Sequence, residues 1–336
     1  IKKAVSSGHI TSRSIPIEDG QIQPASMDLR LGKKAYRLIS SFLPEDSEVM
    51  ERLHTPDIYG SDLVMYETDI SKGGILEKGH VYLIPLIEEL KLPNDIRGRA
   101  NPKSTTGRLD IFARVLTNRS PRFDDIACGY SGQLFLEVMP RSFTIKVKEG
   151  LSLVQLRLVR GECALSDSRL KSLHKSSRLL YNGDEHLSAD DIKVSKGLFM
   201  SVDLSGDNPN GIIGYKSKKN SHVVDLTKKN HYNVADFWEP IQKNSRGTLI
   251  LEPEEFYILS SKEKIRIPPR YAAEMVAYEA GSGELRTHYA GFFDPGFGFG
   301  ANGEVKGTKA VLEVRAHDVP FMIGHGQTFC KLFFER

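Results

Sequence analysis

Short runs in which apolar and polar residues alternate, or in which β-branched residues cluster, recur along most of the chain. Gly, Pro and Asn residues bound these runs, which is typical of β-strands. The pattern predicts strands at Gln133–Val138, Phe143–Val147, Leu153–Leu158, Phe256–Leu259 and Ala310–Val314. Helical patterns are confined to short segments near Ile1–Ser7 and Ala164–His174. We therefore expect an all-β fold with few short helices: a sandwich, a barrel or a jelly roll.

The same landmarks recur at the same spacings in the two halves of the chain, which indicates an internal duplication. The repeated blocks are Leu76-Glu77 with Tyr82 and Leu92-Pro93 (answered by Leu251-Glu252, Tyr257 and Ile267-Pro268), Leu136-Glu137-Val138 with Gly150 (Leu312-Glu313-Val314 with Gly326), and Ser26–Leu29 (Ser201–Leu204). A length of 336 residues suits two domains of about 150 each. We expect domains at residues 1–165 and 197–336, joined by a polar connector over 166–196.

Composition narrows the class of protein. The chain is 40% hydrophobic and 26% charged, with no apolar run near the ~20 residues that a membrane span needs. A net charge of +3 is too small to indicate nucleic acid as a partner. The three cysteines, Cys128, Cys163 and Cys330, fit neither a disulfide framework nor a metal-ligand spacing. We expect a cytoplasmic protein that binds neither membrane nor nucleic acid.

The segment from Asn101 to Arg108 reads Asn-Pro-Lys-Ser-Thr-Thr-Gly-Arg. Hydroxyls, a glycine and two cations in one turn can offer phosphate both charge-assisted donors and a close backbone approach. A capping turn before a short helix explains the same residues, since Ser and Thr are common there. The segment is a candidate phosphate loop with a plain structural alternative.

The segment from Ala290 to Gly298 reads Ala-Gly-Phe-Phe-Asp-Pro-Gly-Phe-Gly. Asp-Pro-Gly is typical of a tight turn, and the flanking aromatic residues suit a hairpin with one packed face. A turn of this kind can bring backbone amides and carbonyls against a flat ring. Base recognition is therefore one interpretation, and a purely structural hairpin is the other.

Glu137 and Glu313 stand in the apolar runs Phe-Leu-Glu-Val and Val-Leu-Glu-Val, where a charge is costly unless it is paired. A carboxylate in such a strand can act as a general base, with burial raising its pKa toward neutrality. Glutamates that point outward from strands are ordinary, and common ancestry alone preserves matched positions. The recurrence marks both residues as candidates and does not choose between them.

Several catalytic motifs are absent from the sequence. No His-x-Glu is followed by Pro-Cys-x-x-Cys, which excludes the zinc-dependent base deaminases. The chain also lacks a P-loop, a dinucleotide-binding fingerprint and a Gly-x-Ser-x-Gly elbow. The glycine-rich run at 296–300 does not follow a strand and open a helix, so it is a weak phosphate candidate.

Together these segments resemble the dCTP deaminase branch of the trimeric dUTPase fold family. The segments that carry the resemblance are the opening Gly20–Gly32 (GQIQPASMDLRLG), Leu92-Pro93 followed by Ser104 and Arg108, Gly129–Gly132 with Glu137, and Asp294–Phe297 with Glu313. They span nearly the whole chain except the connector, and the fused two-copy arrangement is similar to a variant in some bacteria. The resemblance implies two distorted jelly-roll or β-barrel domains.

The resemblance also implies an activity: dCTP and water giving dUTP and ammonia, without zinc, in the supply of dUTP and dTTP. The implied site consists of Glu137 or Glu313 as the general base, Arg108 as electrostatic support, Lys103, Ser104 and Thr105 as phosphate contacts, and Ala290, Asp294 and Gly296 around the nucleoside. Mg²⁺ is expected to accompany the triphosphate, dTTP is a candidate feedback inhibitor, and a homotrimer is the favoured homo-oligomer.

The two copies depart from the family pattern at different places. The first has Ala127-Cys128-Gly129 where the family has Asp-Pro-Gly. The second has Glu279–Arg286 (EAGSGELR) in place of the phosphate loop, although Ser282 and Arg286 keep its four-residue spacing. One copy keeps the better loop and the other the better hairpin. This complementarity suggests a composite site with one part from each half.

Two other functions fit the same residues. A dUTPase, or a bifunctional enzyme that also converts dUTP to dUMP, is the first; Asp294 is present, but Phe297 replaces the tyrosine-type contact of that branch. The second is a nucleotide-binding regulator that kept the fold and lost turnover. Ammonia and pyrophosphate released from dCTP distinguish these functions from a simple deaminase.

Overall fold

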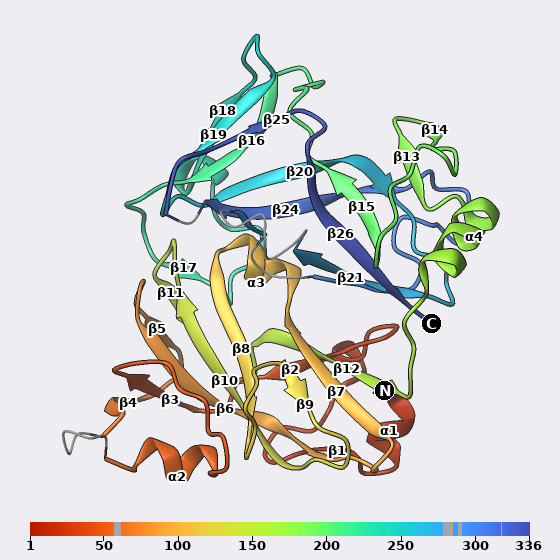
Figure 1. Ribbon diagram of the computed structural model, residues 1–336. Coiled ribbons are helices and arrows are strands. Elements are labelled where there is room, and N and C mark those ends of the chain that lie inside the picture. Colours follow the sequence, from red (N-terminus) through yellow and green to blue (C-terminus); the bar gives the residue numbers. More distant parts are fainter. Residues whose placement is uncertain (57–61, 278–284, 288–290, 317) are drawn as a thin grey trace. The chain divides into compact units, whose positions relative to one another are not determined.

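The computed structural model describes residues 1–56, 62–277, 285–287, 291–316 and 318–336, with the backbone alone at 277 and 285–287. The chain divides into two compact units: residues 1–162 with 219–232, and residues 163–218 with 233–336. Short strands dominate both units and the helices are few and short, which confirms the all-β prediction (Figure 1). No described helix is both long and apolar enough to cross a membrane.

The first unit consists mainly of two facing sheets and one smaller sheet. Its elements are α1 (Lys2–Ser6), β1 (Ile10–Ser12), η1 (Asp19–Gln21), β2 (Met27–Arg30), β3 (Lys34–Leu38), α2 (Val49–Leu53), β4 (Val64–Asp69), β5 (Gly74–Leu76), β6 (Val81–Lys91), β7 (Ile96–Pro102), α3 (Ser104–Arg108), β8 (Ile111–Thr117), β9 (Asp125–Ile126), β10 (Ser131–Pro140), β11 (Ile145–Val147), β12 (Ser152–Arg160) and β17 (Val224–Asp225). The sheets have the strand orders β4-β3-β6-β10-β8, with β1 beside β6, β2-β12-β7-β9, and β17-β11-β5.

The packing of the two larger sheets explains why the central strands are so apolar. Strand β2 contacts β6, and β7 and β12 contact β8, so the two sheets face each other. In β10 every residue of Leu134–Val138 is buried, because neither face of that stretch meets water. At ~25 cal/mol per Å² of apolar area removed from water, such strands supply much of the driving force for folding.

The second unit repeats this arrangement. Its elements are α4 (Asp167–Ser177), β13 (Leu180–Asn182), β14 (Glu185–His186), β15 (Leu198–Ser201), β16 (Ile212–Ser217), η2 (Val234–Asp236), β18 (Trp238–Gln242), β19 (Thr248–Leu251), β20 (Tyr257–Ile265), β21 (Ala272–Ala277), β22 (Leu285–Thr287), β23 (Phe292–Phe293), β24 (Thr308–Ala316), β25 (Phe321–Gly324) and β26 (Thr328–Glu335). The strand orders β18-β16-β20-β24-β22 and β15-β26-β21-β23 match those of the two larger sheets of the first unit, and β19-β25 matches β5-β11 of its small sheet, to which β17 is added. All five predicted strands are present, and α1 and α4 are the two predicted helices.

Equivalent hydrogen bonds show that two of the repeated sequence blocks are structural repeats. The Glu77 amide donates to the Tyr82 hydroxyl at 3.1 Å, and the Glu252 amide to the Tyr257 hydroxyl at 3.0 Å. Likewise the glycine after each Leu-Glu-Val block donates from its amide to a backbone carbonyl at 2.9 Å. These pairs are Gly150 with Leu31 and Gly326 with Val202. Each block is therefore retained because it closes the same turn in both units.

The predicted match between Ser26–Leu29 and Ser201–Leu204 is wrong. The carbonyls of Leu31 and Val202 occupy equivalent places in the two units, and they set a different register. In that register Asp28 of β2 corresponds to Phe199 of β15, not to Asp203. The two Asp-Leu pairs agree by coincidence, since a short match carries no information about which residues pair across the sheet.

Residues 166–196, expected to connect the domains, carry regular structure. Helix α4 begins after Ser166, whose hydroxyl accepts a hydrogen bond from the Arg169 amide at 3.5 Å. Strand β13 pairs with β20, and Leu170, Leu173 and Leu180 lie in the hydrophobic core of the second unit. This segment belongs to the second unit because its apolar residues are buried there.

Candidate active site

The proposed phosphate loop follows β7 and forms the short helix α3. The Lys103 amide and the Thr106 hydroxyl both donate to the Leu153 carbonyl, at 2.9 and 2.7 Å. Thr106 is buried, so its hydroxyl anchors the loop to β12 and is not exposed to a ligand. The remaining polar side chains of the helix are exposed: Ser104, Thr105 and Arg108.

Lys103 forms an ion pair with Asp28 of β2. The Lys103 side chain is 29% exposed and the Asp28 side chain 12%, so the pair lies at the edge of the core. Sequence reasoning did not include Asp28 among the candidate site residues, although a carboxylate between the apolar residues Met27 and Leu29 was a signal for it. Because Asp28 neutralises Lys103, a phosphate at this place requires further positive charge.

A cavity of about 680 Å³ opens beside this ion pair within the first unit. Its polar lining comes from three segments distant in sequence: Asp28, Lys103 and Thr105, and the residues of the 219–232 segment Asp225, Lys228, Lys229, Asn230 and Tyr232. Thr105 and Leu109 line the cavity, whereas Ser104 and Arg108 do not. Residues four apart lie on the same face of a helix, so the two pairs lie on different faces of α3. The predicted phosphate residues are thus divided between two faces of the helix.

Glu137 lies in the middle of β10 and is only 2% exposed. Its Oε1 accepts hydrogen bonds from Nη2 and Nε of Arg114, directly opposite on β8, at 2.5 and 3.1 Å. The Arg114 guanidinium lies 3.5 Å from the ring centre of Phe123 and 4.6 Å from that of Phe112. The other oxygen, Oε2, is buried and accepts no hydrogen bond from a described residue.

Glu313 occupies the equivalent place in β24, opposite Ile258 of β20. It is 8% exposed, so both glutamates of the Leu-Glu-Val blocks are buried. The neighbouring strand β22 pairs with β24 from Thr287 opposite Val314 onward. The second copy therefore also holds a carboxylate in the centre of its larger sheet.

The Asp294–Phe297 segment forms the tight turn that its sequence predicts. The Phe297 amide donates to the Asp294 carbonyl at 3.1 Å, and Gly296 has a φ of +90°, a conformation that favours glycine after proline. The aromatic strand before the turn pairs with β21 instead of forming a hairpin with the residues after it. Ala290 and Ser282 lie outside the described residues, and only the backbone of Arg286 is described, in β22.

The first unit makes the same turn with different residues. The Tyr130 amide donates to the Ala127 carbonyl at 3.2 Å, and Gly129 has a φ of +73°. Burial raises the pKa of the Tyr130 hydroxyl to about 12, and that hydroxyl donates to the Gln133 carbonyl at 2.6 Å. Tyr130 therefore stays protonated near neutral pH and acts as a structural residue.

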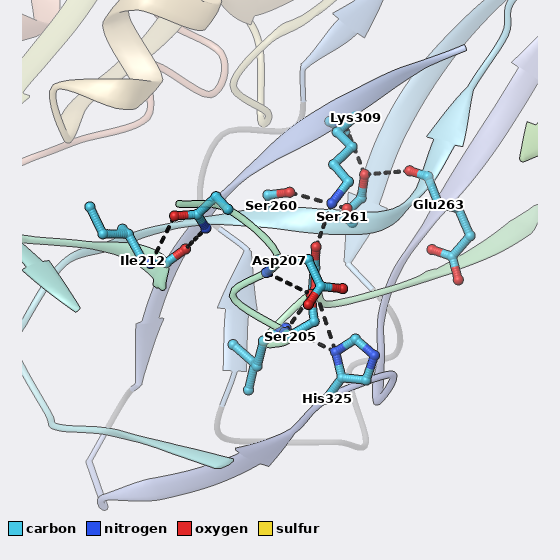
Figure 2. Close-up of polar contacts among 12 residues, drawn as sticks. Ser205, Asp207, Ile212, Ser260, Ser261, Glu263, Lys309 and His325 are labelled. Atoms are coloured by element: carbon cyan, nitrogen blue, oxygen red, sulfur yellow. Dashed lines mark hydrogen bonds and ion pairs between the residues drawn. The ribbon is translucent and has the colours of Figure 1, made fainter. Parts of the chain in front are cut away.

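A polar cluster in the second unit surrounds the Asp203 carboxylate. The Asp203 carboxylate accepts hydrogen bonds from the Ser205 amide and hydroxyl at 2.9 and 2.7 Å, and it forms an ion pair with Lys309. His325 Nδ1 accepts the Leu204 amide at 3.0 Å, and Figure 2 shows Ser205, Lys309 and His325 around this carboxylate. Burial by itself raises the pKa of Asp203, but the hydrogen bonds from Lys309 and Ser205 outweigh it and lower the pKa. These hydrogen bonds and the ion pair fix the loop after β15.

Two further groups are excluded as reactive centres. Cys330 is fully buried in β26, and burial raises the pKa of its thiol to about 12, so it carries no thiolate near neutral pH. Arg266 is buried and donates to the Gly303 carbonyl at 2.8 Å and to the Tyr181 hydroxyl at 2.9 Å. These contacts hold the loop before β24 in place.

Comparison with known proteins places the whole chain in one family. The family model of the 2'-deoxycytidine 5'-triphosphate deaminase N-terminal domain matches residues 1–162, and that of the C-terminal domain matches residues 166–336. A "dCTP deaminase, dUMP-forming" of Parafrankia sp. is 32% identical over 161 residues, covering 48% of this chain and 73% of the relative. One from Sulfurihydrogenibium sp. is 29% identical over 163 residues, covering 48% and 81%.

A solved structure is similar over the full length. The crystal structure of 2'-deoxycytidine 5'-triphosphate deaminase from Agrobacterium tumefaciens matches with a TM-score of 0.91 and 44% sequence identity. The match covers 100% of this chain and 96% of that one. Both halves of the chain, and their arrangement in one polypeptide, therefore have a counterpart in a solved protein.

Proposed function

The chain belongs to the 2'-deoxycytidine 5'-triphosphate deaminase family, and from this premise we propose that it hydrolyses dCTP to dUTP and ammonia. The observation that carries the proposal is the likeness over the whole chain to a solved deaminase, at 44% identity. Water attacks C4 of the cytosine ring, the exocyclic amino group leaves as ammonia, and the oxygen of water remains as the C4 carbonyl.

The reaction needs a base that takes a proton from the attacking water. We propose Glu313 for this role. In support, β24 with Glu313 follows the Asp294-Pro295-Gly296 turn, whereas the first copy has Ala127 and Cys128 in its turn. Glu137 forms an ion pair with Arg114, which is compatible with a structural role.

The second candidate for the base is Glu137, and one observation favours it. Its Oε2 is buried without a hydrogen-bond partner among the described residues, and a buried carboxylate oxygen in that state can accept a proton from a bound water. Replacing each glutamate separately by glutamine distinguishes the two. The composite-site hypothesis stays a prediction that the same pair of variants tests.

We propose Lys103, Ser104, Thr105 and Arg108 as substrate contacts: Lys103 and Thr105 line the cavity and are proposed for the phosphates, whereas Ser104 and Arg108 lie on the other face of α3, with Arg108 as electrostatic support. Asp294, Gly296 and Ala290 are proposed around the nucleoside. We propose that Mg²⁺ accompanies the triphosphate. The carboxylates of the cavity, Asp28 and Asp225, are paired with Lys103 and Lys146, so the ion would be held by phosphate oxygens and water. EDTA is expected to lower turnover, and a zinc-selective chelator is expected to leave it unchanged.

A second candidate function is the further hydrolysis of dUTP to dUMP and pyrophosphate. The names of the relatives favour it, since the enzymes of Parafrankia sp. and Sulfurihydrogenibium sp. are both called dUMP-forming. We also propose inhibition by dTTP and assembly as a homotrimer. Sedimentation velocity and dCTP turnover at increasing dTTP concentration check these two points.

The test of the proposed function is ammonia and pyrophosphate release from dCTP, with product identified by chromatography. A deaminase gives one ammonia per dUTP and no pyrophosphate. Equal amounts of ammonia, pyrophosphate and dUMP support the bifunctional enzyme. Binding of dCTP without any ammonia contradicts both enzymatic proposals and supports a regulator.

A further inference from the structure

Residues 219–232 leave the second half of the sequence and form part of the first unit. Strand β17 pairs in parallel with β11, with Val224 opposite Ile145 and Asp225 opposite Lys146. The Val224 and Leu226 amides each donate at 3.0 Å to carbonyls of the β11 segment, and Lys146 Nζ lies 3.4 Å from the Asp225 carboxylate. The segment is thus fixed to the first unit by both backbone and side chain.

Asp225 organises the loop that follows β17. Its carboxylate accepts hydrogen bonds from the Thr227 amide and hydroxyl at 3.0 and 2.7 Å, and the Thr227 hydroxyl is the main cause of its lowered pKa. The Asp225 amide donates to the Tyr232 hydroxyl at 2.7 Å, which closes the loop. Because both ends are held, the residues between them have a defined place: Lys228, Lys229 and Asn230 line the cavity beside α3.

The charges around this cavity do not cancel. Asp28 pairs with Lys103, and Asp225 pairs with Lys146, so four of the charged groups neutralise one another. Lys228 and Lys229 are exposed and form no ion pair with any part of the chain that the structure describes. Two unpaired lysines therefore face a cavity that also presents the Thr105 hydroxyl, a combination that attracts a polyanion.

The equivalent insertion of the first copy is different in kind. It lies between β3 and β4, carries the acidic residues Glu45, Asp46, Glu48 and Glu51, and buries Val49 and Leu53 of α2 in a core cluster. The basic loop is therefore a property of the second copy alone.

We propose that Lys228 and Lys229 bind the phosphate chain of the nucleotide in this cavity. The proposal rests on the proposed function and deepens it, since the triphosphate of dCTP is the polyanion the enzyme must hold. Residues 219–232 then form a phosphate-binding element that complements the weakly cationic α3 loop, in which Lys103 is already neutralised by Asp28. Lys228 and Lys229 add positive charge to the cavity beside α3, where Asp28 neutralises Lys103.

The test compares the Lys228→Ala/Lys229→Ala enzyme with the wild type in dCTP turnover. KM for dCTP is expected to rise about 10- to 100-fold, since two charge-assisted contacts are lost, while kcat stays within about threefold. Lys228→Arg/Lys229→Arg is expected to restore most of the affinity. Lys171→Ala/Lys175→Ala on α4 removes two other exposed lysines and is expected to change nothing. Inorganic tripolyphosphate is expected to inhibit the wild type competitively and the alanine variant far more weakly.

A KM within twofold of the wild type overturns the proposal. So does a fall in Tm and kcat that arginine fails to restore, because that result assigns the lysines a structural role only. If the wild type releases no ammonia, the proposed function fails. Calorimetric binding of tripolyphosphate then still tests whether Lys228 and Lys229 bind phosphate. Binding that the alanine variant loses supports the phosphate element, and absence of binding to the wild type overturns it.

Discussion

The two units share the arrangement of their two larger sheets and differ in the loops that connect the strands. Both have the same strand orders, and both close equivalent turns with the amide of Glu77 or Glu252 and with the amide of Gly150 or Gly326. One difference is the insertion between β3 and β4 in the first copy and between β16 and β18 in the second. The others are the candidate phosphate loop and the tight turn that precede the central glutamate in the sequence. Backbone hydrogen bonds within the sheets constrain both copies, whereas exposed loops were free to diverge.

The central glutamates show the same contrast on a smaller scale. Glu137 is bound by Arg114, which in turn lies against Phe112 and Phe123. Glu313 stands at the equivalent place in the copy that keeps the Asp-Pro-Gly turn. The proposal assigns them different roles: the base to Glu313 and a structural role to Glu137.

The largest expected effect is the loss of turnover in Glu313→Gln. Glutamine keeps the shape of the side chain but cannot accept the proton of the attacking water, so kcat for dCTP deamination is expected to fall roughly 10²- to 10⁴-fold. Steady-state ammonia release measures it. The fold should persist, with an unchanged circular dichroism spectrum. Full activity in this variant contradicts the assignment of the base.

Glu137→Gln is expected to act on stability instead. It removes the negative partner of Arg114, and breaking a buried ion pair costs roughly 3–5 kcal/mol. Because the Arg114 side chain is 25% exposed and glutamine can still accept one hydrogen bond, we expect a loss of about 1–3 kcal/mol. Urea unfolding measures this loss, and Glu67→Gln, on the exposed strand β4, serves as the control. An unchanged midpoint together with abolished turnover would show that Glu137 is catalytic.

The smallest effect distinguishes the units by pH. His174 lies in helix α4 of the second unit, and burial lowers the pKa of this histidine, whose Nδ1 accepts the Leu179 amide at 3.3 Å. The unfolded state then binds the proton more readily. The stability from neutral His174 is fully present above the unfolded pKa of about 6.5 and is lost as pH falls below it.

We expect the thermal midpoint of the second unit to fall between pH 7.5 and 5.5, and His174→Gln to flatten this dependence. Differential scanning calorimetry measures it, and the exposed His54 of the first unit provides the matched control, His54→Gln. Equal slopes in the wild type and His174→Gln would assign the pH dependence to other groups.

Sequence alone predicted the fold class, the duplication and most central strands, because alternation and spacing record which residues pair within a sheet. It misaligned Asp28 with Asp203, since a short match does not fix register. It placed Lys103 and Thr105 in the candidate site but missed Lys228 and Lys229, which lie more than a hundred positions away in the sequence. Only the pairing of β17 with β11 brings these lysines to the loop.

Lys228 and Lys229 of the first unit are the proposed contacts for the phosphates of the substrate. A crystal structure of Glu313→Gln with dCTP tests this claim most directly, because the variant is expected to bind substrate without consuming it. We predict triphosphate density within hydrogen-bonding distance of Thr105, Lys228 and Lys229. Triphosphate bound away from all three residues would contradict it.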